Sequence, residues 1–191
     1  MRVFIVVLVL IFSLQSWTKA DDISEFEIEG VSVGDSLLDY MTISEIKNNK
    51  IDYGSGRKFY ATDYNKNLST YDKVEIWIKS SDDSYKIYGI NSGIYFENNL
   101  DECLKQKNEI INDLEETFKN FKFSSGKKKH DAYKDSIQYT SHVYLGNSRD
   151  NIRVECIFFG KKTKKKYRFQ DYLAVVSQSG QILKWISDGY N

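Results

Sequence analysis

Alternation between apolar and polar residues is the feature that most constrains how this chain can fold. In segment 73–80, KVEIWIKS, the side chains of Val74, Ile76 and Ile78 fall on one face and polar residues fall mainly on the other. A period of two is typical of a β-strand with one buried face. Further segments of strand character follow the same rule or form short apolar runs, at 57–64, 86–97, 136–145, 152–159 and 167–177. Short turns join most of them, which predicts antiparallel neighbours.

One long stretch has helical periodicity instead. It follows Asn98 and Asn99, which can cap a helix, and runs to about residue 121. Its apolar stripe consists of Leu100, Cys103, Leu104, Ile110, Ile111, Leu114, Phe118 and Phe121. Two short helices are predicted earlier, at about 36–41 and 43–49, the second because Thr42 and Glu45 have the spacing of a capping box.

Together these segments predict an α+β fold, in which antiparallel sheet packs against one long amphipathic helix and short N-terminal helices. Helical segments followed by strands occur twice, which is consistent with two tandem α-then-β units, 21–97 and 98–191, within one domain. The polar stretch 124–135 is predicted to be a mobile loop, and the lysine-rich segment after Gly160 a turn. Segment 181–186 fits either a closing strand or a short helix.

The N-terminal segment has the pattern of a secretory signal peptide. Arg2 precedes an apolar run over residues 3–14, and Ala20 provides a small residue for cleavage, so we expect a signal peptide at 1–20. The apolar run is too short for a membrane span, and no later segment is apolar for long enough. The absence of proline and the abundance of Lys, Asn and Ile indicate a bacterial, AT-rich genome. We therefore expect an exported protein, periplasmic or extracellular.

The chain contains two cysteines, Cys103 in the long helix and Cys156 in a predicted strand. In an exported protein, two cysteines most simply form a disulfide. The bridge would tie the helix to the sheet and stabilise the fold by about 4 kcal/mol on the chain-entropy model. The alternatives are two buried free thiols or a redox pair, although the CxxC spacing of catalytic dithiols is absent.

Charge is balanced over the whole chain, with 27 basic and 27 acidic residues, but it is unevenly distributed. Residues 21–121 hold 11 basic and 21 acidic side chains, whereas residues 122–168 hold 13 and 4. The basic side chains gather in two clusters, 127–129 and 161–168 (KKTKKKYR), whose lysines are Lys127, Lys128, Lys129, Lys161, Lys162, Lys164, Lys165 and Lys166. One interpretation is solvated loop tips that keep strand edges apart. The other is a surface that contacts an anionic polymer or an acidic envelope protein.

Residues 34–37, Gly-Asp-Ser-Leu, resemble the nucleophile motif of GDSL-type esterases. That resemblance implies Ser36 as nucleophile, with an Asp three residues before a catalytic His. Neither His130 nor His142 has an Asp at that offset. The same four residues fit a tight turn followed by a helix cap, which is the interpretation we favour.

A longer stretch, IEGVSVGDSLLDY at 28–40, is similar to the opening of a group of uncharacterised exported proteins from AT-rich marine bacteria. The likeness extends to the Cys103 helix and the Cys156 strand. The predicted layout also resembles outer-membrane assembly lipoproteins and β-lactamase inhibitory proteins, in architecture only. Such a likeness implies a fold and carries no function by itself.

The sequence thus predicts a small, exported, non-catalytic protein that binds a cell-envelope partner. The alternatives are a GDSL-type serine hydrolase and a secreted inhibitor. No metal-ligand spacing or phosphate-binding loop is present, so we expect no cofactor and no metal. Export argues against a nucleic acid as partner, and the sequence leaves the oligomeric state open.

Overall fold

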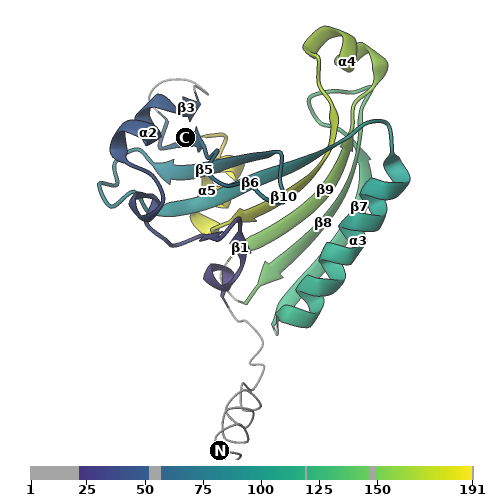
Figure 1. The fold of residues 1–191 in the computed structure, drawn as a ribbon. Coiled ribbons are helices and arrows are strands. Elements are labelled where there is room, and N and C mark those ends of the chain that lie inside the picture. The colour runs from purple at the N-terminus through teal and green to yellow at the C-terminus, as the bar shows by residue number, and fades with distance from the viewer. Residues whose placement is uncertain (1–21, 52–56, 119, 147–148, 191) are drawn as a thin grey trace, which may run out of the picture.

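The computed structural model describes residues 22–51, 57–118, 120–146 and 149–190, and it has the predicted α+β fold (Figure 1). The predicted signal peptide, 1–20, lies outside the described residues. Ten strands are present: β1 Glu27–Ile28, β2 Val31–Ser32, β3 Lys50–Ile51, β4 Phe59–Asp63, β5 Lys73–Lys79, β6 Ile87–Phe96, β7 Phe121–Lys129, β8 Ile137–Leu145, β9 Asn151–Phe158 and β10 Asp171–Gln178. The helices are η1 Ile23–Glu25, η2 Leu37–Asp39, α2 Ile43–Asn48, α3 Leu100–Thr117, α4 Lys161–Tyr167 and α5 Gly180–Ser187.

Eight of the strands form one antiparallel sheet in the order β3-β4-β5-β6-β10-β9-β8-β7. The last strand, β10, lies in the middle, where it pairs with β6 on one side and β9 on the other. Figure 1 shows this yellow strand between the teal β6 and the green β9. Strands β3–β6 of the first predicted α-then-β unit and β7–β10 of the second are therefore the two halves of a single sheet, while β1 and β2 pair with each other in a separate two-stranded sheet.

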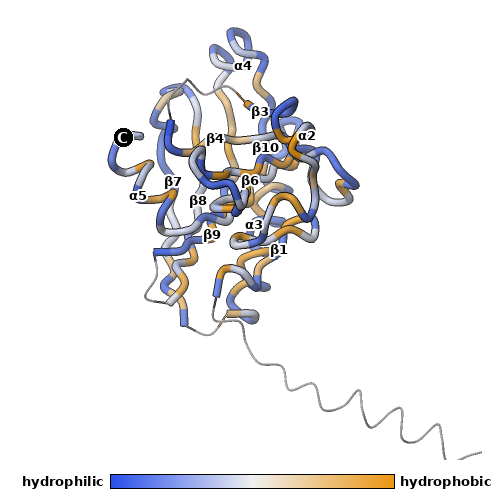
Figure 2. Tube along the Cα trace, turned by 90° about the vertical axis from the view of Figure 1, so that its left-hand side faces the viewer, coloured by the Kyte–Doolittle hydropathy of each residue, from blue (hydrophilic) through white to orange (hydrophobic). Residues whose placement is uncertain are grey.

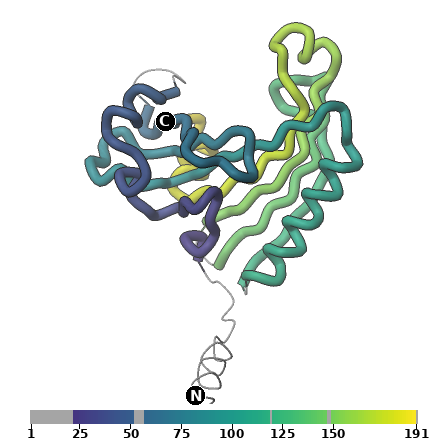
Figure 3. The backbone as a smooth tube through the Cα atoms, in the orientation of Figure 1, coloured from purple at the N-terminus to yellow at the C-terminus, as the bar shows by residue number. Residues whose placement is uncertain are grey.

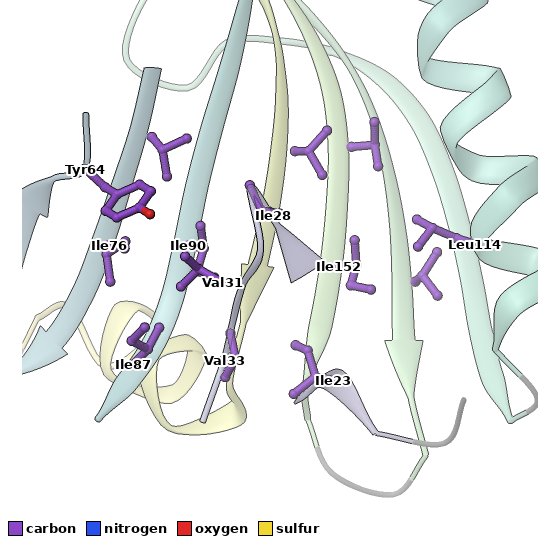
Figure 4. Close-up of a cluster of buried hydrophobic side chains, with 14 of the residues drawn as sticks. Ile23, Ile28, Val31, Val33, Tyr64, Ile76, Ile87, Ile90, Leu114 and Ile152 are labelled. Atoms are coloured by element: carbon purple, nitrogen blue, oxygen red, sulfur yellow. The ribbon is translucent and has the colours of Figure 1, made fainter. Parts of the chain in front are cut away.

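The main core lies on one face of the sheet, beneath α3 and the N-terminal segment. Ile28, Val31 and Val33 are buried against strand residues such as Ile90 and Ile152 (Figure 4). The predicted disulfide joins Cys103 of α3 to Cys156 of β9, with a Cα–Cα distance of 6.1 Å. Both cysteines are fully buried, so the bridge fixes the helix on the sheet from within the core.

The opposite face is covered by α5 over the β4–β6 half. Trp185 packs against Phe59 at 5.2 Å between ring centroids, and Ile182 approaches Gly89 of β6. Segment 181–186 is thus helical, which decides between the two alternatives left open by the sequence. In Figure 2, α5 and β7 lie toward one side of the molecule, and α3 and β1 toward the other.

Three predicted boundaries were wrong. Residues 124–129, predicted as part of a mobile loop, belong to strand β7, because each pairs in register with a residue of β8. The lysine-rich segment after Gly160 is helix α4 and not a simple turn. The long helix ends at Thr117, and Phe121 starts β7. In each case, pairing or packing at a distance overrides the local pattern.

Candidate binding site

The two lysine clusters lie at the same end of the molecule. Lys127, Lys128 and Lys129 form the last residues of β7, directly before the turn that leads into β8. The other cluster forms α4, which connects β9 to β10. The backbone trace in Figure 3 shows the α4 segment standing clear of the sheet at the top of the view.

Asp135 of the β7–β8 turn holds the two clusters together. Its carboxylate accepts hydrogen bonds from the backbone N–H groups of Lys162 at 3.0 Å and Thr163 at 3.2 Å, and from the Thr163 hydroxyl. The Thr163 hydroxyl is the largest cause of the lowered pKa of Asp135, and both N–H groups lower it further. The carboxylate therefore caps the first turn of α4, a position that favours negative charge.

Gly160 allows this close approach. A Cβ atom at residue 160 would lie 2.2 Å from Oδ2 of Asp135 and 2.3 Å from its carbonyl oxygen. No side chain can occupy that space without moving the turn. The absence of a side chain at Gly160 is thus part of what places α4 beside the end of β7.

Not all the predicted lysines are available to a partner. Lys164 lies 2.6 Å from Asp171 and 2.9 Å from the side-chain oxygen of Asn98, so it ties α4 to the fold. Lys128 forms an exposed ion pair with Asp131 at 2.7 Å, which lowers the pKa of Asp131. A hydrogen bond with Tyr167 raises the pKa of Lys166.

All the lysines of the two clusters except Lys164 have exposed side chains, and Arg168, which ends the second cluster, is exposed beside them. We call this surface the basic end. It consists of Lys127, Lys128, Lys129, Lys161, Lys162, Lys165, Lys166 and Arg168. Its chemistry is that of fixed cations on a protruding element, which attract anions and supply hydrogen-bond donors.

An aromatic cluster supports the basic end from below. Tyr133 of the turn lies 5.2 Å from Phe169 and 5.5 Å from Tyr167, both edge-on, and Phe159 lies 4.9 Å from Phe169. Such pairs stabilise an arrangement beyond the area they bury. Tyr167 remains 45% exposed. The cluster therefore makes the turn and α4 one packed unit.

A polar hollow of about 660 Å³ adjoins the β7 part of the basic end, and Lys127, Lys128 and His130 are among the residues that line it. Within it, Glu155 of β9 is buried and accepts hydrogen bonds from Thr140 at 3.2 Å and Gln138 at 3.3 Å. Nε of Arg153 lies 3.1 Å from the same carboxylate. These side chains neutralise each other and leave the basic end as the surface of net positive charge.

The serine and the two histidines considered for the GDSL-type hydrolase each have local structural contacts. Ser36 caps η2: its hydroxyl accepts from the Leu38 N–H at 3.3 Å and donates to the Ser84 carbonyl at 2.8 Å. This confirms the cap interpretation of that residue. His130 lies in the β7–β8 turn, where its Nδ1 accepts from the Ala132 N–H at 3.2 Å. His142 stacks on Tyr144 within β8, and burial lowers its pKa.

Two further kinds of functional feature are absent from the described residues. In the part of the chain that the structure describes, no three His, Cys, Asp or Glu side chains are grouped so as to hold a metal ion. Among the helices of the same residues, none is long and apolar enough to cross a membrane.

The fold and the site define an α+β protein with a protruding basic end backed by aromatic rings. Comparison with family models, with curated proteins and with solved structures found no match for this chain.

Proposed function

We propose that the protein is an exported, non-catalytic binding protein whose basic end docks on an anionic partner in the bacterial cell envelope. The observation that carries the proposal is the joining of two lysine clusters, more than 30 residues apart in the sequence, through Asp135. Isolated short charge runs are usually solvated surface. Two lysine runs held together on one packed unit produce a single, larger region of positive electrostatic potential.

Export is supported by the signal-like N-terminal pattern and by the buried disulfide, since disulfides persist in oxidising compartments. The partner class follows from the charge. An interface between exposed lysines and carboxylates or phosphates gains much of its association rate from long-range attraction. At an ionic strength of about 1 M, that attraction is screened beyond about 3 Å.

The test is affinity capture of the oxidised protein from envelope extract under mild cross-linking, at low and high salt. The basic-end variant replaces Lys161, Lys162, Lys165 and Lys166 with Gln. A matched control variant replaces four exposed lysines elsewhere, Lys47, Lys58, Lys105 and Lys184, with Gln, so that the net charge changes equally. We expect a stoichiometric partner that is lost at high salt and with the basic-end variant, and kept with the control.

Retention of the partner by the basic-end variant would contradict the proposal. The serine hydrolase alternative stays a prediction with its own test. Labelling by a fluorophosphonate that disappears in Ser36→Ala would replace binding by catalysis as the function. The secreted inhibitor is distinguished by the identity of the captured partner, which would then be an enzyme whose turnover the protein blocks.

A further inference from the structure

Strand β7 ends the sheet with a long, open edge. Among the described residues it pairs with β8 alone, and eight of its nine residues, from Lys122 to Lys129, are exposed. The other edge of the sheet, β3, has only two residues. An unpaired edge is a template for another strand, and proteins usually shorten, cover or charge it. Here it is neither short nor covered.

The hydrogen-bond alternation shows which groups are free on that edge. The His130 N–H donates to the Ser136 carbonyl at 2.9 Å, and the Gly146 N–H donates to the Asn120 carbonyl at 2.8 Å. In an antiparallel pair, bonded and non-bonded positions alternate. Even-numbered residues of β7 therefore bond to β8, and odd-numbered residues direct their N–H and C=O groups outward.

The side chains of the same odd-numbered residues change from aromatic to positively charged along the strand. From one end of the strand to the other, the row consists of Phe121, Phe123, Ser125, Lys127 and Lys129. Their side chains share the face of the sheet on which Ser125 contacts Ser141, at 3.1 Å between hydroxyl oxygens. Phe123 is 45% exposed. The edge thus offers apolar contact at its start and positive charge at its end.

We infer that the edge of β7 binds an extended acidic segment of the partner by antiparallel strand addition. This inference rests on the proposed function, because Lys127 and Lys129 belong to the basic end. Antiparallel addition continues the pairing of the whole sheet. It places the N-terminal half of the added segment beside Lys129 and Lys127, and its C-terminal half beside Phe123 and Phe121. The partner segment therefore carries carboxylates first and apolar residues afterwards, at alternate positions.

A second copy of the chain fits this edge poorly. Antiparallel pairing of β7 with itself about Ser125 places Lys127 opposite Phe123, so charge meets an apolar ring. On the other face it places Lys128 opposite Lys122, and like charges directly opposite are destabilising. In this register the lysines disfavour self-pairing, whereas they attract an acidic strand.

The probe is a synthetic peptide, Glu-Thr-Glu-Thr-Ser-Thr-Val-Thr-Val, labelled for fluorescence anisotropy. Its matched control is the same composition in reverse order. Ser125→Pro removes an outward N–H while it leaves every lysine in place, and proline is tolerated at an edge where the N–H faces solvent. Ser125→Ala is the control for loss of the hydroxyl. We expect Ser125→Pro to weaken peptide binding by about tenfold or more, which equals about 1.4 kcal/mol.

A second version of the test changes only the probe, in case the proline variant does not fold. Peptides N-methylated at the amides that would face β7 should lose binding, and peptides N-methylated at the alternate amides should keep it. Equal binding of the forward and reversed peptides, or equal effects of the two methylation patterns, would overturn the inference. So would self-association of the protein that Ser125→Pro abolishes.

Phosphatidylglycerol vesicles separate this inference from the proposed function. One possible outcome is that the protein binds vesicles but not the peptide, that the basic-end variant weakens vesicle binding, and that Ser125→Pro has no effect on it. The basic end then binds anions, and the strand-addition inference is wrong. If neither vesicles nor peptide binds and no partner is captured, both are wrong. Peptide binding that is sensitive to Ser125→Pro supports the inference directly.

Discussion

Reduction of the disulfide between Cys103 and Cys156 should lower the free energy of unfolding by about 4 kcal/mol. The bridge closes a loop between residues 53 apart. On the chain-entropy model, a loop of that length removes about 14 cal/mol/K from the unfolded chain, which is about 4 kcal/mol at 25 °C. Both cysteines are fully buried, so the native contacts of the two sulfur atoms stay largely in place when the covalent bond is broken.

The assay is urea unfolding followed by tryptophan fluorescence, with and without reductant. With a slope of about 2 kcal/mol per molar urea, the midpoint should fall by about 2 M on reduction. The double variant Cys103→Ala with Cys156→Ala is the control, and reductant should not change its midpoint. A shift below about 0.5 M at unchanged slope would show that the unfolded chain is not restricted as the loop model requires.

Three further predictions concern single side chains. Gly160→Ala should displace the β7–β8 turn from α4, costing about 1–3 kcal/mol in urea unfolding, whereas Gly126→Ala, which has open space around its Cβ, should cost far less. Lys107→Met should stabilise by about 1 kcal/mol at neutral pH, because the ammonium is buried, bonds to the Ser141 hydroxyl and has a pKa lowered by burial. That gain should shrink as pH rises toward 10.5, since the unfolded state then also loses its proton; a gain independent of pH would contradict the explanation. Burial alone would raise the pKa of Glu29, but N–H groups of residues 69–71 bring it to about 2. Glu29→Gln should therefore cost about 1 kcal/mol at pH 7, and the difference from the wild type should vanish as pH falls from 4.5 through 2.

Much of the fold follows from local pattern. The alternation in β5 and the stripe of α3 are properties of neighbouring residues, so the predicted and observed ranges differ by only a few positions. The disulfide followed from compartment and number of cysteines, without any geometry. These features are independent of how the distant parts of the chain meet.

Strand β7 shows where local pattern fails. Its last six residues, SSGKKK, combine residues of low β-propensity and have no buried face. It is extended because β8 offers a complete row of backbone partners. A strand stabilised mainly through its neighbour leaves little signal in its own residues.

The sequence shows part of the arrangement at the candidate site. Both lysine clusters were identified from composition, but their joining depends on Asp135, which is an ordinary turn residue in the sequence. Asp135 can cap α4 only because Gly160, in the β9–β10 connection, comes into contact with Asp135 in the β7–β8 turn.

The central place of β10 has a consequence for how the chain folds. The strand is the last of the chain, yet both halves of the sheet depend on it for their connection. Neither half can complete its pairing until β10 has been synthesised and is free to insert between β6 and β9. Sheets built from such distant pairings fold slowly, because chain entropy must be lost before the contacts form. During that interval β6 and β9 present two temporary edges, so the incompletely folded chain should be more prone to aggregation or chaperone binding than the folded protein.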